Sequence, residues 1–335
     1  MPLQYMIAAA IIPAVLLVWF FYKADARPEP PRVVLWTFGL GVLSTLGVLA
    51  IVIPIKLYVF DFATLASPIA AAAGRAFCFA AIPEELFKFG VLFFYAARHR
   101  AFDEPMDGIV YGATASLGFA ALENIMYTVS GGMVVAIMRA ITAVPAHACF
   151  GAVMGYFVGR ARFRRSKAGW LFYPLALFWP IVLHGLYDFP LMASASLAEV
   201  PGWLEGVLFL GAILVLVLGV VWTLLLVRKM KRRQRRENGV EQKEPTPTPA
   251  PIPLAKRRAK SGVGTIVMLV SGAILTGLGA LVLLGCTIGF FTDPPEAEQV
   301  IPVLCCVGVL GIFPTAGGVV LFLLGLRRLH GGQSK

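Results

Sequence analysis

The sequence predicts an all-α membrane protein, a polytopic transmembrane helical bundle of about nine spans. Of its 335 residues, 59% are hydrophobic and only 14% are charged, whereas soluble domains average about 25% charged residues. The mean hydropathy is +0.81, and apolar stretches recur along most of the chain. A helix needs roughly 20 apolar residues to cross the hydrocarbon core, so each of these stretches is a candidate span.

The stretches that meet this length follow one another from the N-terminus to the C-terminus. They are residues 3–22, 33–54, 66–97, 108–129, 132–159, 169–192, 205–227, 263–291 and 300–326. The third and fifth are longer than a bilayer requires. For these two we expect a tilt, a kink at Pro83 or Pro145, or an extension beyond the membrane.

Basic residues are concentrated in alternate connections between the spans. The net charge is +11, and the basic clusters are residues 160–167, 228–236, 256–260 and 327–328. The intervening connections 129–131, 193–204 and 292–299 contain no Lys or Arg. Since cytoplasmic loops carry the excess of Lys and Arg, this pattern predicts an outside N-terminus and a cytoplasmic C-terminus. The basic loops are then expected to contact anionic lipids, and no nucleic-acid partner is expected.

A basic and Pro-rich linker, residues 228–262, divides the chain. Its alternating prolines favour an extended conformation and cannot build a core. The linker separates a seven-span body, 1–227, from a two-span C-terminal hairpin, 263–335. The predicted spans of the hairpin contain no Asp, Glu or His, so the chemistry is predicted to lie in the body.

The third predicted span contains two adjacent carboxylates and a lysine. Glu84 and Glu85 follow Pro83 directly, and a proline at the start of a helix would place both at an N-terminus that favours negative charge. Lys88 lies one turn later and can neutralise one of them. A purely structural ion pair would leave the second carboxylate without a partner. Ionisable residues inside a membrane span are functional-site candidates.

Polar groups also occur in the next three spans. Glu123 and Asn124 are adjacent in the fourth span, where they could form a hydrogen-bonded contact between helices. His147 lies in the fifth span, and glycines follow it at positions 151, 155 and 159, which allows close approach of another helix. In the sixth span Asp188 lies one turn after His184, where a carboxylate can fix the tautomer of the ring.

These groups share one depth in the membrane. At ~1.5 Å per residue from the cytoplasmic flank they lie about 20–25 Å deep, slightly outside the midplane. The charges do not balance, because Glu84, Glu85, Glu123 and Asp188 face Lys88 alone, an excess of three negative charges. Protons, imidazolium or a divalent cation must compensate them. Two histidines and a carboxylate would suit zinc with an open position for water.

The four motifs together resemble the PrsW family of intramembrane proteases. They are EExxK at 84–88, FxxxEN at 119–124, HxxxG at 147–151 and HxxxD at 184–188. The resemblance covers roughly residues 1–227. The wider group that includes CAAX prenyl endopeptidases typically shows EExxxR and then FxxxH. Here Lys88 lies one position earlier than that Arg and Glu123 replaces that histidine, which favours the PrsW branch.

The resemblance implies an intramembrane endopeptidase in a bacterial plasma membrane. Its substrate would be a membrane-anchored protein, possibly an anti-sigma factor, cut on the extracytoplasmic side of the bilayer midplane. The expected catalytic residues are Glu84, Glu85, Lys88, Glu123, Asn124, His147, His184 and Asp188. Glu84 or Glu85 would act as the general base, while His147, His184 and Glu123 would hold zinc or stabilise the oxyanion. A metal-free glutamate mechanism stays open.

Three other functions fit parts of the pattern. A proton- or ion-coupled transporter would also use Glu, Asp and His chains, but the sequence lacks the internal repeats that such proteins often show. A CAAX-type prenyl-protein endopeptidase would need the departures described above to be tolerated. A scaffold with polar contacts between helices would not require a common depth. The motifs of other intramembrane proteases, such as HExxH, are absent.

Overall fold

A computed structural model describes residues 3–59, 61–65, 67–164, 167–196 and 201–241, together with Thr276. Within these residues the chain is helical and contains no strand, which confirms the predicted all-α class. Two compact units are distinguished, Met1–Gln242 and Lys243–Lys335. The predicted linker beyond residue 241 and, apart from Thr276, the predicted hairpin 263–335 lie outside the described residues.

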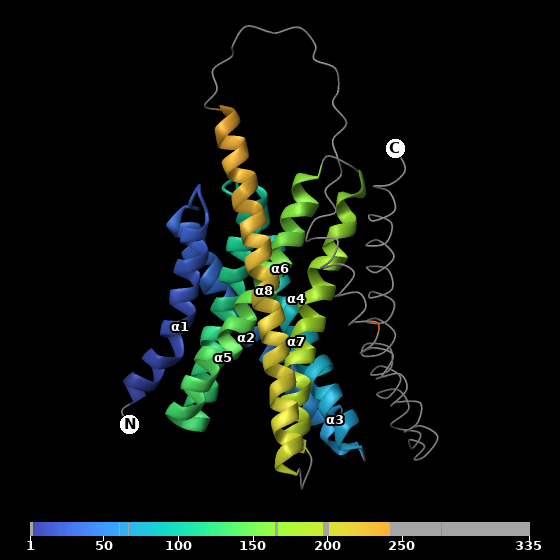
Figure 1. Ribbon diagram of the computed structural model, residues 1–335. Helices are drawn as coiled ribbons and strands as arrows, with labels where there is room; N and C mark the ends of the chain where they lie inside the picture. Colours follow the sequence, from blue (N-terminus) through green and yellow to red (C-terminus); the bar gives the residue numbers. More distant parts are fainter. Residues whose placement is uncertain are drawn as a thin grey trace, which may run out of the picture. The chain divides into compact units, whose positions relative to one another are not determined.

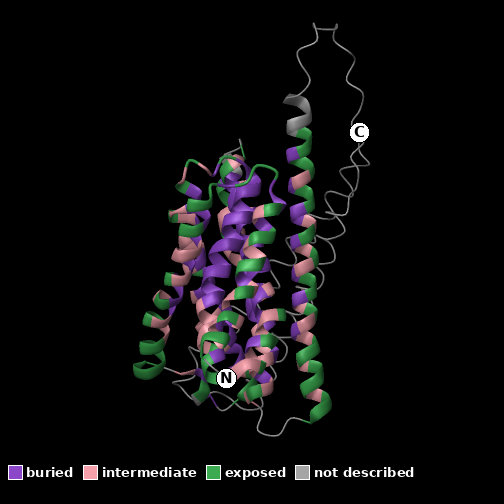
Figure 2. Ribbon diagram, turned by 90° about the vertical axis from the view of Figure 1, so that its left-hand side faces the viewer, coloured by how far each residue is buried: buried purple, intermediate pink, exposed green. Residues whose placement is uncertain are grey.

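Among the described residues, the first unit consists of eight α-helices, three 3-10 helices and one π-helix. Figure 1 shows their arrangement. They are α1 (Leu3–Ala24), α2 (Pro31–Tyr58), η1 (Phe62–Thr64), α3 (Pro68–Gly74), η2 (Arg75–Ala81), α4 (Ile82–Phe94), η3 (Ala96–Arg98), α5 (Pro105–Ile141), α6 (Ala143–Phe163), η4 (Lys167–Leu171), α7 (Phe172–Ser196) and α8 (Gly202–Glu241). The C-terminal end of α8 projects beyond the other helices of this unit (Figures 1 and 2).

Five helical stretches of the described chain are long and apolar enough to cross a membrane. They are Leu3–Ala24, Pro31–Tyr58, Pro105–Phe163, Gly169–Ser196 and Gly202–Arg236. The third of these has 59 residues and contains both α5 and α6. The protein is therefore an integral membrane protein, as the composition predicted.

The predicted span 66–97 is divided into three consecutive helical segments, α3, η2 and α4. The middle segment η2 is a π-helix, and the N–H of Ile82 donates to the carbonyl of Phe77, five residues earlier. Pro83 lies in the first turn of α4. Because proline has no N–H and crowds the preceding turn, it breaks the regular α-helical ladder at the position where a kink was predicted.

The chain reverses direction inside α5, at Gly132. This glycine has φ +76° and ψ −169°, a conformation that other residues rarely adopt. In a straight helix, residues 123 and 139 would be ~24 Å apart. Instead, Arg139 and Glu123 form an ion pair of 2.8 Å. The reversal lies at the predicted boundary between spans 108–129 and 132–159, so the fifth predicted span corresponds to the end of α5 followed by α6.

Every residue of α5 from 105 to 121 is buried. Figure 2 shows that buried residues gather in the interior of the helical bundle. Helix α5 packs against α1, α2 and α6, most extensively against α6. At their glycines, the backbones of α5 and α6 come into direct contact. A Cβ atom on Gly112 would lie 2.3 Å from the carbonyl oxygen of Gly151, and one on Gly155 would lie 1.7 Å from that of Gly108. The close approach predicted from Gly151, Gly155 and Gly159 is confirmed, and the neighbouring helix is α5.

Candidate active site

Glu84 and Glu85 occupy the first turn of α4, and a buried lysine joins them. Lys88 Nζ donates to Glu84 Oε2 at 3.0 Å and to Glu85 Oε1 at 2.8 Å. It also lies 3.0 Å from His147 Nδ1, on α6. The lysine side chain is fully buried, 4.2 Å from the ring centroid of Phe119. All three ammonium protons thus have a partner, and Lys88 bridges both carboxylates, where the sequence predicted the neutralisation of one.

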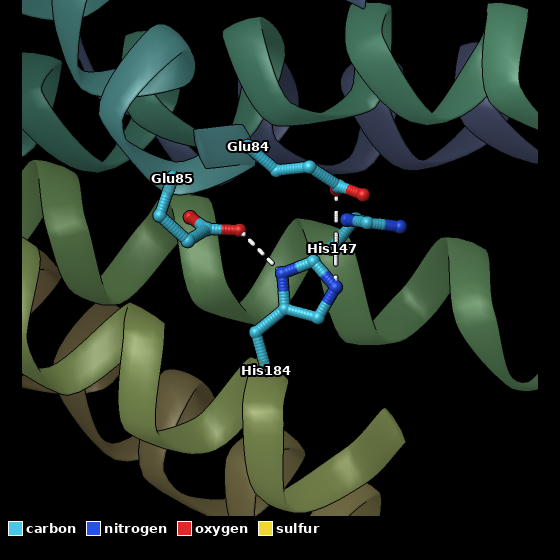
Figure 3. Close-up of side chains that lie close together, drawn as sticks. All are labelled: Glu84, Glu85, His147 and His184. Carbon is cyan, nitrogen blue, oxygen red and sulfur yellow. Dashed lines mark hydrogen bonds and ion pairs between the residues drawn. The ribbon is translucent and has the colours of Figure 1, made fainter. Parts of the chain in front are cut away.

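Helix α7 brings the second imidazole to the same place. His184 Nδ1 lies 2.9 Å from Glu85 Oε1, and its Nε2 lies 3.2 Å from Asp188 Oδ2. The same Nε2 is 3.8 Å from Glu84 Oε2. Figure 3 shows the two glutamates of α4 turned toward His184, with His147 beside them. The ring centroids of the two histidines are 5.1 Å apart. Asp188 thus contacts the ring that its spacing in the sequence predicted.

Glu123 contacts the far side of the His147 ring. Its Oε2 lies 2.9 Å from His147 Nε2 and accepts from Arg139 Nη2 at 2.8 Å. Asn124 is buried behind it, where its amide donates to the carbonyl of Ala10 at 2.9 Å and accepts from Arg139 Nε at 2.9 Å. These two bonds join Asn124 to a backbone carbonyl and to a guanidinium, and neither reaches a histidine or a carboxylate. The structure therefore gathers the predicted residues of α4, α5, α6 and α7, with Asn124 at the edge of the group.

Arg139 is a member of this group that the sequence analysis missed. Its guanidinium lies 4.0 Å from the ring centroid of Tyr127, in addition to its bonds to Glu123 and Asn124. The sequence does contain an indication of its role, because Arg139 is the one Lys or Arg inside the predicted span 132–159. The predicted excess of three negative charges is wrong for this reason. The four carboxylates face two cations, Lys88 and Arg139, which leaves an excess of two.

The donor set fits a divalent cation. In the described part of the chain, Glu84, Glu85, His147 and His184 each offer a ligand atom, and these atoms lie within 4.8 Å of one another. The second carboxylate oxygen of Glu85 is buried and has no hydrogen-bond partner. Imidazole nitrogens and carboxylate oxygens are the donors that zinc takes, and two excess negative charges match its charge. Glu123, predicted as a third ligand, is not one of these four residues, and its Oε2 lies 2.9 Å from His147 Nε2.

Carboxylates, imidazoles and a lysine inside a membrane-spanning bundle are the groups that an intramembrane hydrolase uses to activate water. The comparisons with known proteins give the same class. Residues 29–225 match the family model described as PrsW family intramembrane metalloprotease. The chain therefore belongs to the PrsW family of intramembrane proteases, as the motifs predicted.

This chain is also similar to relatives named Protease PrsW, and the similarity extends over most of the length of each relative. The one from Geobacillus kaustophilus is 40% identical over 56% of this chain and 80% of its own. The one from Bacillus subtilis is 39% identical over 57% of this chain and 84% of its own. The one from Halalkalibacterium halodurans is 36% identical over 55% and 81%. No solved structure gives a significant match.

Proposed function

We propose that this protein is an endopeptidase of the bacterial plasma membrane that cleaves a membrane-anchored protein on the extracytoplasmic side of the bilayer midplane. The archetypal substrate of the family, an anti-sigma factor, is the first candidate. The alternation of basic loops supports about nine spans with an outside N-terminus and a cytoplasmic C-terminus. In this proposal residues 1–227 are the protease domain, 228–262 the linker and 263–335 an accessory membrane hairpin.

The observation that carries the proposal is the buried meeting of two adjacent carboxylates with two imidazoles. The two glutamates differ in accessibility, and this difference supports a different role for each. The Glu84 side chain keeps 10% of its surface exposed, whereas Glu85 has none. Glu84 can therefore reach a water molecule beside a peptide carbonyl and act as the general base. Glu85 Oε1 holds Lys88 and His184 in place.

The cationic and N–H groups of the site are suited to stabilise the negative charge that develops on the carbonyl oxygen. Lys88 and His184 are held by carboxylates in fixed positions, so they require little rearrangement during the reaction. Where zinc is present, His147 and His184 with Glu84 or Glu85 would hold it, and it would supply Lewis acidity and an activated water. Without zinc, the same residues form a glutamate peptidase.

The test is proteolysis of a single-span membrane substrate by the purified full-length protein in detergent. We expect Glu84→Gln to lower kcat by about 10²–10⁴-fold, the range for loss of a general base. Glu85→Gln should lower activity too, and also thermal stability, because Glu85 holds two buried partners. Glu205→Gln, an exposed acid in the first turn of α8, is the matched control. Wild-type turnover by both Glu84→Gln and Glu85→Gln at equal expression would reject the assignment.

Metal analysis of the same preparation separates the two chemistries. Stoichiometric zinc that is lost in the His147→Ala, His184→Ala double variant would establish a metalloprotease. Undiminished activity after exhaustive chelation, with no bound metal detected, would establish a glutamate peptidase.

A further inference from the structure

We infer that Arg139 is a positioning residue that acts through Glu123 to hold the His147 ring as its Nε2–H tautomer. In that tautomer the lone pair of Nδ1 faces the carboxylates of α4. The inference rests on the proposed function only for its effect on catalysis, because the tautomer itself can be measured without a substrate.

The partners of the ring determine its tautomer. An ammonium group can only donate, so the contact of 3.0 Å between Lys88 Nζ and His147 Nδ1 requires Nδ1 to be an acceptor. A neutral imidazole then carries its proton on Nε2. That nitrogen lies 2.9 Å from Glu123 Oε2, and a carboxylate oxygen accepts this proton. The neutral Nε2–H form therefore satisfies both contacts, and the charged form would direct an N–H at the ammonium.

Arg139 fixes the carboxylate that fixes the ring. Its Nη2 donates to the same oxygen of Glu123 that faces His147. Its Nε donates to Asn124, whose amide is in turn bound to the backbone of α1 through Ala10. The guanidinium also lies over the ring of Tyr127. These contacts hold the guanidinium on both its edge and its face, and the exposed fractions of the Arg139 and Glu123 side chains are 17% and 14%.

One consequence concerns the metal ligands. The four residues with converging ligand atoms include His147. Lys88 contacts Glu84, Glu85 and His147 Nδ1 at once, so these two carboxylates lie toward the Nδ1 side of the ring. Glu123 lies on the opposite side, at Nε2. Glu123 therefore orients the ring and does not bind a metal that His147 binds. Carboxylates that accept from the second nitrogen of a ligating histidine act in this way in known metal sites.

The tautomer is measured by nitrogen NMR on the full-length, metal-free protein with ¹⁵N-labelled histidine in lipid nanodiscs. The chain has four histidines, and the His147 signals are those missing from a His147→Asn variant. We expect the wild-type protein to show a protonated Nε2 and an unprotonated Nδ1. A protonated Nδ1 in the wild type would overturn the inference without any further variant.

Variants then test the role of Arg139. We expect Arg139→Gln to give a mixture of His147 tautomers and to lower kcat about 10–100-fold, as other losses of an orienting partner do, with KM nearly unchanged. Arg139→Lys should restore part of the Nε2–H tautomer and part of kcat, since a cation remains beside Glu123. Arg98→Gln is the control, because Arg98 also lies on an aromatic ring but is exposed beyond the end of α4. A wild-type tautomer and kcat in folded Arg139→Gln would overturn the role.

Zinc added alone gives a further readout. If zinc binds His147 through Nδ1, its Nε2 proton signal persists while the Nδ1 signal shifts. Loss of the proton from Nε2, with Nδ1 protonated, would place the metal on the Glu123 side and overturn the assignment of Glu123. If Arg139→Gln gives the expected mixture of tautomers but keeps the wild-type kcat, the result would instead count against the proposed role of His147 in proteolysis.

Discussion

At the scale of single residues, Lys88 holds the place that a metal ion would need. Its ammonium contacts three of the four residues that offer converging ligand atoms, namely Glu84, Glu85 and His147. A metal ion held by these residues would compensate the same carboxylates as the lysine. It would therefore compete with Lys88 for the same atoms, and we expect the lysine to lower the affinity of the site for metal.

We expect Lys88→Met to bind zinc more tightly than the wild type while being less stable without it. Removing one partner of a buried ion pair typically costs about 3–5 kcal/mol, and here two carboxylates lose their shared cation. Zinc titration and thermal unfolding in detergent, with and without zinc, measure both effects. Lys56→Met is the control, since Lys56 is exposed near the end of α2. A wild type that binds zinc beside a Lys88→Met variant that does not would contradict the competition.

At this scale the sequence predicts contacts between residues one helical turn apart, but not contacts between residues that are distant in the sequence. The contacts of Lys88 with Glu84 and Glu85, and of Asp188 with His184, join residues one helical turn apart, so their spacing predicts them. The contact of Arg139 with Glu123 crosses the reversal at Gly132. The two lie at similar distances from that turn, seven residues after it and nine before it. Their pairing further depends on which face each helix presents, and hydropathy does not report this.

At the scale of elements, the α5–α6 contact sets the distance between two site residues. Glu123 lies on α5 and His147 on α6, and the glycines of both helices let the backbones touch. The sequence predicted this approach but not its partner helix. It also predicted one long span at 66–97, where the structure has α3, the π-helix η2 and α4. An apolar π-helical turn has the same composition as an α-helical one, so only Pro83 indicated the break.

Gly155→Ala should therefore damage the site from a distance. The added Cβ would lie 1.7 Å from the carbonyl oxygen of Gly108, so a helix must shift. We expect a loss of stability of about 1–3 kcal/mol, typical of overpacking, and lower proteolysis as Glu123 and His147 separate. Thermal unfolding and the cleavage assay measure these effects. Gly39→Ala on α2, where nothing lies within 4 Å, should be neutral or slightly stabilising. Equal melting temperatures for Gly155→Ala and wild type would contradict this packing.

At the scale of the whole first unit, a second group of acids joins distant helices at the end where the basic loops lie. Gln234 of α8 donates to Asp25 Oδ1 at 2.6 Å and also to Glu104, which precedes α5. Glu29, between α1 and α2, accepts from the hydroxyl of Tyr111. The three acids are at most 5% exposed. Their burial could not be predicted from the sequence, because acids outside the predicted spans are usually solvated and their burial depends on how the helix ends meet.

The buried acids Asp25, Glu29 and Glu104 should make the free energy of unfolding of this unit decrease as the pH rises. Burial raises the pKa of Glu29 from 4.5 to about 7, and burial also raises the pKa values of Asp25 and Glu104. Below about pH 4.5 Glu29 is protonated in the folded and the unfolded chain, so it contributes no pH dependence there. Between about pH 4.5 and 7 the unfolded chain releases the proton while the folded chain keeps it, so stability is lost across this window.

The test is the melting temperature of the purified protein at pH 5, 6, 7 and 8 in one detergent. We expect the contribution of Glu29 to make the melting temperature decrease toward pH 7 and to stay constant above it. Glu29→Gln keeps a neutral, hydrogen-bonding side chain beside Tyr111 at every pH, so it should flatten the decrease. Glu205→Gln, an exposed acid at the other end of α8, should leave the decrease unchanged. A melting temperature that rises from pH 5 to pH 7, or an identical profile in Glu29→Gln, would show that Glu29 does not retain its proton in the folded protein.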